Sequence, residues 1–315
     1  MRFSLFLILL IWSFLVSAQS KDVLVVHSYH QGFFWTDNFQ KGLAIELERD
    51  DIPYRVVYLD SKRAQSDEYF DKLYQLYRTK LANEEFSAVV VSDNNALNLM
   101  KRLAPELNGT PVVFGGINNY SPSMTEGLNA TGITEDIDLN SNVTLIQRLQ
   151  PMANKIYIVS DFSVTGEAVR AQVDRHLDQY PQHASFIEHY QPRSYRELVN
   201  FAQQADMSKS LLFWVYYRDE KGNVSNDDDW RELNKLTKMP IYMVHDLGLG
   251  FGAIGGVIQS GLSQGRETGL TLRRMLANPD QELPPVVEGA AEIKLDYQQL
   301  NRWDLGEYSD LSATF

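Results

Sequence analysis

The chain has 315 residues, with 41 acidic and 29 basic side chains and a net charge of −12. This negative balance argues against nucleic-acid binding, which needs a basic surface. Because cysteine is absent, the sequence excludes disulfide bonds, a thiol nucleophile, cysteine metal ligands and a lipid-modified cysteine.

The first 18 residues have the pattern of a signal peptide. Arg2 supplies a positive start, residues 3–16 are apolar, and the small residues at 16–18 suit cleavage after Ala18. The apolar run is shorter than the about 20 residues of a membrane span, which makes an uncleaved anchor the less favoured alternative. We expect a soluble periplasmic protein, with room for two domains of about 150 residues each.

The first half alternates strands and helices. Short apolar runs predict strands, and apolar residues at helical spacing predict helices. The expected strands are 22–28, 54–59, 87–91 and 112–114, and the expected helices are 37–50, 68–81 and 96–103. Asp37 is expected to cap the first helix. Residues 131–134 are interpreted as a crossover segment.

The same alternation then starts again. Helices are expected at 140–149, 166–177, 194–205, 227–236 and 262–276, and strands at 155–159, 185–190, 210–215, 240–244 and 254–258, with one more near Ile293. Ser194 is expected to cap its helix. Two similar α/β halves predict two parallel sheets joined by right-handed crossovers.

The predicted organisation is a signal peptide (1–18), a first lobe (19–125) to which later chain returns, a second lobe (126–250), and crossover segments with a C-terminal helix and tail (251–315). The hinge is expected near 120–140, with further crossings near 245–255 and 285–297. Loops of both sheets would then face one cleft, a preferred place for a small ligand.

The strand at 112–114 is followed by Gly115, Gly116, Asn118 and Asn119. Glycine allows a sharp turn or a close approach, and the amides offer donors and acceptors. Ligands of open α/β sheets bind at this carboxyl edge of the strands. Gly116 and Asn118 are therefore candidate ligand contacts, while an ordinary turn is the alternative for Asn118.

The loop 28–35 places four aromatic residues beside Ser28, His30 and Gln31. Aromatic side chains on a loop can stack on or enclose a ligand. We expect Ser28, Tyr29 and Trp35 to line the cleft, whereas Phe33 and Phe34 could equally fill the domain core.

Asp93 and Asn94 lie between a strand and a helix. Helix capping is at least as good an interpretation as ligand binding. In a binding role, Asp93 would suit an amine and the helix amides a carboxylate.

In the second half, Asp161 and Thr165 lie in a loop between strand and helix, where capping is again the alternative. Tyr216 and Tyr217 continue a strand, so alternation would point only one of them at the cleft. Asp246 is the last candidate ligand contact. His245 and Asp246 could form a catalytic pair of a hydrolase, which is a remote alternative.

Residues 250–255 spell G-x-G-x-x-G, but no clear strand and helix flank them, so a nucleotide loop is rejected and a flexible hinge segment preferred. Neither a nucleophile elbow nor a P-loop is present, and the six histidines lack metal spacing. We therefore expect no catalytic residue, metal ion or cofactor.

Four segments together resemble the substrate-binding family of ABC transporters that includes tryptophan- and tyrosine-binding proteins, and most closely its branch of extracytoplasmic sensor domains of histidine kinases and diguanylate cyclases. The segments are 25–37, 114–118 with 127–133, 149–156 and 297–303. The resemblance covers nearly the whole mature chain.

The resemblance implies a type I periplasmic-binding-protein fold, with two Rossmann-like lobes that close over a small molecule by hinge motion. The expected function is capture of a small organic ligand, such as an amino acid, for ABC-type uptake through a permease. The alternative is a sensor subunit that presents its ligand state to a membrane histidine kinase or diguanylate cyclase. That membrane protein would be a separate chain, because no membrane helix lies between the sensor-like segment 297–303 and Phe315.

Overall fold

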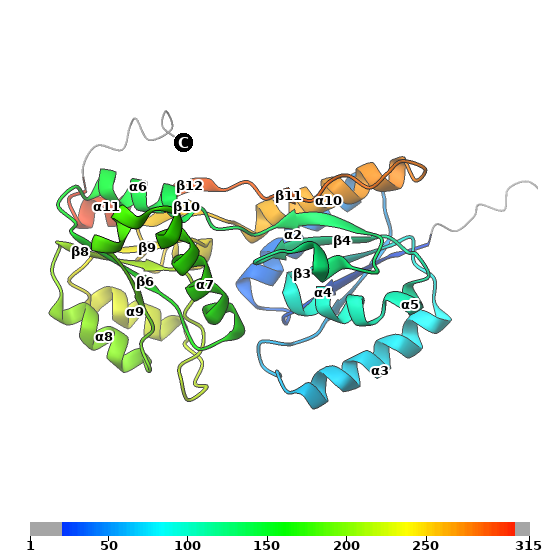
Figure 1. Ribbon diagram of the computed structural model, residues 1–315, viewed down its shortest axis with the longest axis horizontal. Helices are drawn as coiled ribbons and strands as arrows, with labels where there is room; N and C mark the ends of the chain where they lie inside the picture. Colours follow the sequence, from blue (N-terminus) through cyan, green and yellow to red (C-terminus); the bar gives the residue numbers. More distant parts are fainter. Residues whose placement is uncertain (1–20, 306–315) are drawn as a thin grey trace, which may run out of the picture.

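The structure is a computed structural model that describes residues 21–305. Two lobes lie side by side along the long axis of the molecule, and each is built on its own sheet (Figure 1). The signal peptide predicted at 1–18 lies outside the described residues. Within residues 21–305, no helix is both long and apolar enough to cross a membrane.

Lobe 1 is built on six parallel strands in the order β11-β5-β4-β3-β1-β2. They are β1 (Val23–His27), β2 (Tyr54–Tyr58), β3 (Ala88–Ser92), β4 (Val112–Ile117), β5 (Ala130–Thr134) and β11 (Val287–Glu288). Every residue of β1 and β3 is buried, as expected of parallel strands covered on both faces.

Helices cover both faces of this sheet. One face carries α2 (Phe34–Arg49) and α10 (Gly261–Ala277), and the other carries α3 (Asp67–Asn83), α4 (Asp93–Arg102) and the short α5 (Ala104–Leu107). A 3₁₀ turn, η1 (Pro122–Thr125), follows β4. Alternate residues of β1 pack into the hydrophobic cores on the two faces of the sheet. Leu24 packs on the face covered by α4, and Val25 on the face covered by α2.

Lobe 2 repeats the plan with strands in the order β12-β10-β9-β8-β6-β7, of which β12 alone runs antiparallel to its neighbour. The strands are β6 (Lys155–Val159), β7 (Ile187–Tyr190), β8 (Lys209–Phe213), β9 (Ile241–Met243), β10 (Gly255–Ile258) and β12 (Glu292–Leu295). The helices are α6 (Leu139–Leu149), α7 (Val164–Gln179), α8 (Tyr195–Gln204), α9 (Asp227–Leu236) and α11 (Tyr297–Arg302), with 3₁₀ turns η2 (Pro181–Ser185) and η3 (Asp246–Gly248).

The predicted cap at Ser194 is confirmed, because its side chain accepts a hydrogen bond from the backbone N–H of Glu197. Two other helix starts differ from expectation. Helix α2 begins at Phe34, before Asp37, and Asp37 instead accepts a hydrogen bond from Gly32 N. Trp35 therefore belongs to the first helical turn and is buried there.

Asp93 is the first residue of α4 rather than its cap, with a positive φ of 66°. The backbone N–H of Ala96, in the first turn of α4, donates to the hydroxyl of Ser28 in the loop after β1, at 2.8 Å. Residues 131–134, expected as a crossover, form most of β5 inside the sheet of lobe 1.

The chain crosses between the lobes three times: at 135–138 after β5, at 259–260 after β10, and at 289–291 between β11 and β12. The first and third crossings lie within the expected ranges. The second lies beyond the expected 245–255, because η3 and β10 still belong to lobe 2. Helix α10 then returns to lobe 1 and packs along α2 (Figure 1).

Glycine allows the close contact between α2 and α10. A Cβ atom at Gly265 would lie 2.0 Å from the carbonyl oxygen of Phe39, and one at Gly42 would lie 2.1 Å from that of Leu262. No side chain fits at either distance, so the two backbones approach each other directly. This contact fixes the returning helix on lobe 1.

Candidate functional site

A cavity of about 500 Å³ lies between the lobes and is walled largely by aromatic rings. Lobe 1 contributes the loop after β1 and the start of α2, and lobe 2 contributes the ends of β8 and β9 and the segments that follow them. The aromatic side chains that line it are Tyr29, Phe33, Phe34, Trp35, Phe213, Trp214, Tyr216, Tyr217, Trp230 and Phe251. A cavity of this size accommodates a small organic molecule.

Two aromatic contacts bring the lobes together at this cavity. Phe33 meets Tyr217 edge-to-face with ring centroids 5.8 Å apart, and Trp35 meets His245 edge-to-face at 5.5 Å. The core-filling interpretation of Phe33 and Phe34 is wrong: both line the cavity, and Phe34 is 48% exposed.

Tyr216 and Tyr217 both line the cavity, although strand alternation predicted that only one would. The reason is that β8 ends at Phe213, so the residues after it no longer alternate between two faces. Trp214 and Val215, which were expected inside the strand, also line the cavity.

Asp93 presents a buried carboxyl group to the cavity. The residue is 4% exposed, and Oδ2 has no hydrogen-bond partner among the described residues. Burial raises the pKa of Asp93 to about 7, against the opposing effects of the Lys62 charge and of Tyr29 and Trp35 nearby. A carboxyl oxygen without a partner suits a hydrogen-bond donor or a cation of the ligand.

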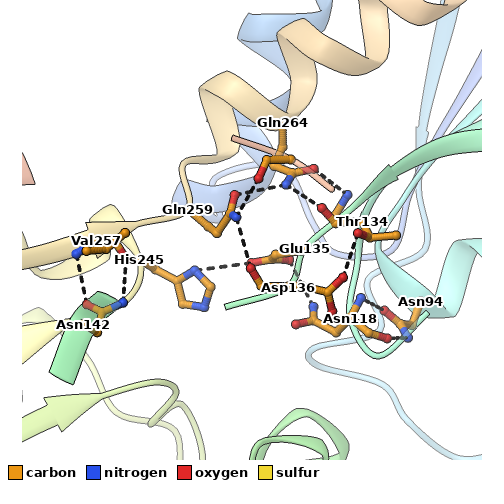
Figure 2. Close-up of polar contacts among 12 residues, drawn as sticks. Asn94, Asn118, Thr134, Glu135, Asp136, Asn142, His245, Val257, Gln259 and Gln264 are labelled. Carbon is orange, nitrogen blue, oxygen red and sulfur yellow. Dashed lines mark hydrogen bonds and ion pairs between the residues drawn. The ribbon is translucent and has the colours of Figure 1, made fainter. Parts of the chain in front are cut away.

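A second buried carboxyl group comes from Glu135, in the first crossover. Its Oε2 accepts a hydrogen bond from Asn118 Nδ2 at 3.0 Å, and its Oε1 lies 3.3 Å from Nδ1 of His245 (Figure 2). Burial and the nearby Asp93 charge raise the pKa of Glu135 well above its ordinary value. Burial also lowers the pKa of His245 to about 4. At neutral pH the imidazole is therefore uncharged, and the shift of Glu135 favours its protonated form.

Sequence reasoning missed Glu135 and Lys62, and both line the cavity. Lys62 lies in the loop after β2. Candidate residues were predicted in the loops after β1, β3 and β4, but none was predicted in this loop. Glu135 follows β5, which was not recognised as a strand. A search of every loop after a parallel strand would have found both residues.

The predicted contacts fall into two groups. Tyr29, Trp35, Asp93, Asn118, Thr165 and Tyr216 line the cavity, whereas Ser28, Asn94, Gly116, Asp161 and Asp246 lie outside its lining. Direct contact with a ligand stays a prediction for the first group.

Most of the residues outside the lining hold the lining residues in place by hydrogen bonds. Asn94 and Asn118 are joined by two hydrogen bonds of 3.0 Å, from Asn94 Nδ2 to Asn118 O and from Asn118 N to Asn94 Oδ1 (Figure 2). Ser28 donates to Ser92 O at 2.7 Å, next to Asp93. Gly116, at a positive φ of 67°, donates its N–H to Oε1 of Gln264.

Asp161 organises the loops of lobe 2 from a fully buried position. Its Oδ2 accepts hydrogen bonds from the backbone N–H groups of Tyr217 at 2.7 Å and Arg218 at 3.0 Å. Its Oδ1 accepts from Ser163, whose side chain in turn caps α7. The carboxylate is fully used inside lobe 2, and it holds Tyr217 at the cavity.

Asp246 begins η3 and has a pKa raised by burial, but it does not line the cavity. His245 instead faces Trp35 and Glu135 across the lobes. Among residues 21–305, no group of three or more histidine, aspartate or glutamate side chains is arranged to hold a metal ion.

One buried glutamine connects the three crossovers. Gln259, in the second crossover, donates from Nε2 to Asp136 O in the first at 3.2 Å and to Gly289 O in the third at 3.0 Å. Its Oε1 accepts from Nε2 of Gln264, which also donates to Thr134 O (Figure 2). These bonds hold the three crossovers together where the chain passes between the lobes.

Three solved structures share this architecture. A ligand-free, open substrate-binding protein with adhesive properties from Clostridium difficile has a TM-score of 0.67 at 14% identity, over 92% of this chain and 97% of that one. An ABC domain from Streptococcus pneumonia in complex with L-Trp has a TM-score of 0.65 at 18% identity, over 93% and 98%. A glucose-galactose binding protein from Geobacillus stearothermophilus has 0.60 at 11%, over 88% and 98%.

No protein-family model matches the sequence, and no curated protein matches it. At these identities the structural matches establish the fold alone. The expected fold class is confirmed: the chain is an α/β protein with the two-lobe fold of type I periplasmic binding proteins.

Proposed function

We propose that this chain is a solute-binding protein that captures one small organic molecule between its lobes. The observation that carries the proposal is the interlobe cavity, which is walled by aromatic rings from both lobes and lined by Asp93, whose Oδ2 has no hydrogen-bond partner among residues 21–305. Rings from both lobes can enclose a ligand only when the lobes close, so binding and closure are coupled.

An amino acid is the ligand class that we infer. Asp93 Oδ2 suits an amino group, and the rings of Trp35 and Trp214 suit an apolar or aromatic side chain. The similarly folded domain from Streptococcus pneumonia was obtained with L-Trp, which supports this class, although the sugar-binding neighbour has the same fold.

We place the protein in the periplasm on the strength of the predicted signal peptide, and we assign it to ABC-type uptake. The alternative role is a sensor subunit that reports its ligand to a membrane histidine kinase or diguanylate cyclase. Cross-linking in intact cells, followed by identification of the captured membrane protein, separates the two: a permease supports uptake, and a kinase or cyclase supports sensing.

We further propose that the ligand leaves unchanged, without catalysis. Burial keeps His245 neutral and places it against Trp35 and Glu135, and Asp246 lies outside the cavity lining. A bound ligand that is recovered with an altered mass after incubation with the protein would overturn this part of the proposal.

The experiment for the proposed function is a thermal-shift screen of the mature protein against amino acids, nucleosides, sugars and oligopeptides. A ligand that binds only the folded state adds about 2.7 kcal/mol to the free energy of unfolding at a concentration of about 100 Kd, and the melting temperature rises accordingly. We expect at least one amino acid to act in this way. A rise with sugars alone would reject the amino-acid class.

A further inference from the structure

Lys62 brings an ammonium group to the wall of the cavity. The residue is 7% exposed, and it lies in the loop between β2 and α3. Its Nζ lies 4.5 Å from the ring centroid of Tyr29, 5.6 Å from that of Phe33 and 5.2 Å from that of Tyr217. Among residues 21–305, no carboxylate lies within ion-pair distance of this nitrogen.

The cage of rings does not compensate for the loss of water around this charge. Burial lowers the pKa of Lys62, and the negative charges of Asp161, Asp93 and Glu135 oppose that shift only in part, while the nearby Arg218 adds to it. The empty protein thus holds the ammonium less favourably than water does. What the site lacks is a close anion.

The cage is also formed only when the lobes are closed. Tyr29 and Phe33 belong to lobe 1 and Tyr217 to lobe 2, and Nη2 of Arg218 donates to the main-chain oxygen of Lys62 at 2.6 Å. Closure therefore brings a third ring and the Arg218 side chain against Lys62 and leaves it 7% exposed. A ligand that supplies a negative charge at this point would favour closure over the open form.

We propose that Lys62 is a specificity-determining residue, whose Nζ pairs with an anionic group of the ligand inside this ring cage. The assignment rests on the proposed solute-binding function and deepens it: ligands that carry a carboxylate or a phosphate are selected over neutral and purely cationic molecules of the same shape. Asp93, on the same cavity, then receives the donor groups of the ligand.

The test uses Lys62→Met, which keeps the length and the apolar contacts of the side chain and removes its charge. The control is Lys72→Met, because Lys72 is exposed on α3 of the same lobe and pairs only locally with Glu68. Melting temperature and binding are measured with L-phenylalanine, L-tyrosine and L-tryptophan, with the amide of each, and with phenyl phosphate. The acids and their amides differ in the anionic group alone, and the phosphate distinguishes the two anion types.

We expect the acids, or the phosphate, to bind the natural protein and the Lys72→Met control at least about ten-fold more tightly than they bind Lys62→Met, as the loss of a charge-assisted hydrogen bond implies. The amides should bind the natural protein weakly. Without ligand, Lys62→Met should melt at the same temperature as the natural protein or higher, because an unpaired buried charge has been removed.

Equal binding of an acid by the natural protein and Lys62→Met would overturn the assignment and leave the proposed function in place. Equal binding of an acid and its amide would do the same. A lower melting temperature of Lys62→Met with unchanged affinity would show a purely structural ammonium, and would also overturn the assignment. Silence from every probe, and from the wider screen above, would remove the proposed function and the assignment with it.

Discussion

Arg218 of lobe 2 reaches across the cleft and donates from Nη2 to the main-chain oxygen of Lys62, at 2.6 Å. The loop that carries Arg218 is held by the buried carboxylate of Asp161, which accepts its backbone N–H. A rigid loop of one lobe is therefore hydrogen-bonded to a loop of the other, at the edge of the cavity. The contact can exist only in the closed arrangement.

Replacement of Arg218 by methionine should shift the population toward the open form. A hydrogen bond from a charged group contributes about 1.5–3 kcal/mol, so closure becomes roughly ten-fold or more less favourable. We expect a larger radius of gyration in solution scattering without ligand and weaker ligand binding. Arg231→Met, at an exposed arginine on α9, is the matched control. An unchanged scattering curve would mean that Arg218 does not hold the lobes closed.

Replacement of Gln259 by leucine should weaken the hinge. The change leaves the carbonyl groups of Asp136 and Gly289 without this donor inside a buried region. Each unsatisfied group costs about 1–3 kcal/mol, so we expect a loss of roughly 2–6 kcal/mol in the free energy of unfolding. Urea denaturation measures it, with Gln298→Leu on the exposed side of α11 as control. A loss no greater than that of the control would show that the three crossovers do not depend on this brace.

Replacement of Asp93 by asparagine should change how stability depends on pH. The pKa of Asp93 is raised from 3.8 to about 7, so the folded protein still binds a proton where the unfolded chain has released it. This contribution to stability is present below pH 4 and is lost as pH rises from about 4 to 7, by up to ~4 kcal/mol. Above pH 7, Asp93→Asn should therefore be more stable than the natural protein.

The measurement is the difference between the urea unfolding curves of the two proteins from pH 4.5 to 8. Asp51→Asn is the control, because Asp51 also has a positive φ but is exposed. Histidines with lowered pKa values, such as His27, are common to both proteins and cancel in the difference. A difference that does not vary with pH would contradict a buried, protonated Asp93.

Replacement of Gly265 by alanine should separate α10 from α2. The new Cβ atom would lie 2.0 Å from the carbonyl oxygen of Phe39, a backbone atom that cannot turn away. Overpacking of this kind typically costs 1–3 kcal/mol, and more where backbone must move. Thermal unfolding measures the loss, and Arg274→Ala on the exposed face of α10 serves as control. An equal melting temperature would mean that the helices have room to adjust.

The alternation of apolar strands and helices was sufficient to predict the fold class. Parallel strands such as β1 and β3 are uniformly apolar because both faces are covered, so their sequence signal is strong. Strands with a weaker apolar pattern were not recognised from the sequence. Residues 131–134 contain Thr131 and Thr134 and read as a linker, but they form a strand because β4 and β11 pair with them on both sides.

The site was predicted only in outline, because local sequence cannot show which polar side chains form their hydrogen bonds within the protein. Ser28 and Asp161 have the residue types of a binding site, yet their oxygens accept or donate within one lobe. Lys62 looks like an ordinary surface lysine in the sequence. In the fold it contacts Tyr29 and Tyr217, residues that are far from it in the chain.

Native mass spectrometry of the mature protein, released gently from the periplasm of cells that express it, tests the central claim most directly. The account predicts a one-to-one complex with a small organic molecule that is absent from a Trp35→Ala, Tyr217→Ala double variant, which removes one ring wall from each lobe. A ligand that remains bound to the folded double variant, or a natural protein that stays empty with every compound of the screen, would contradict it.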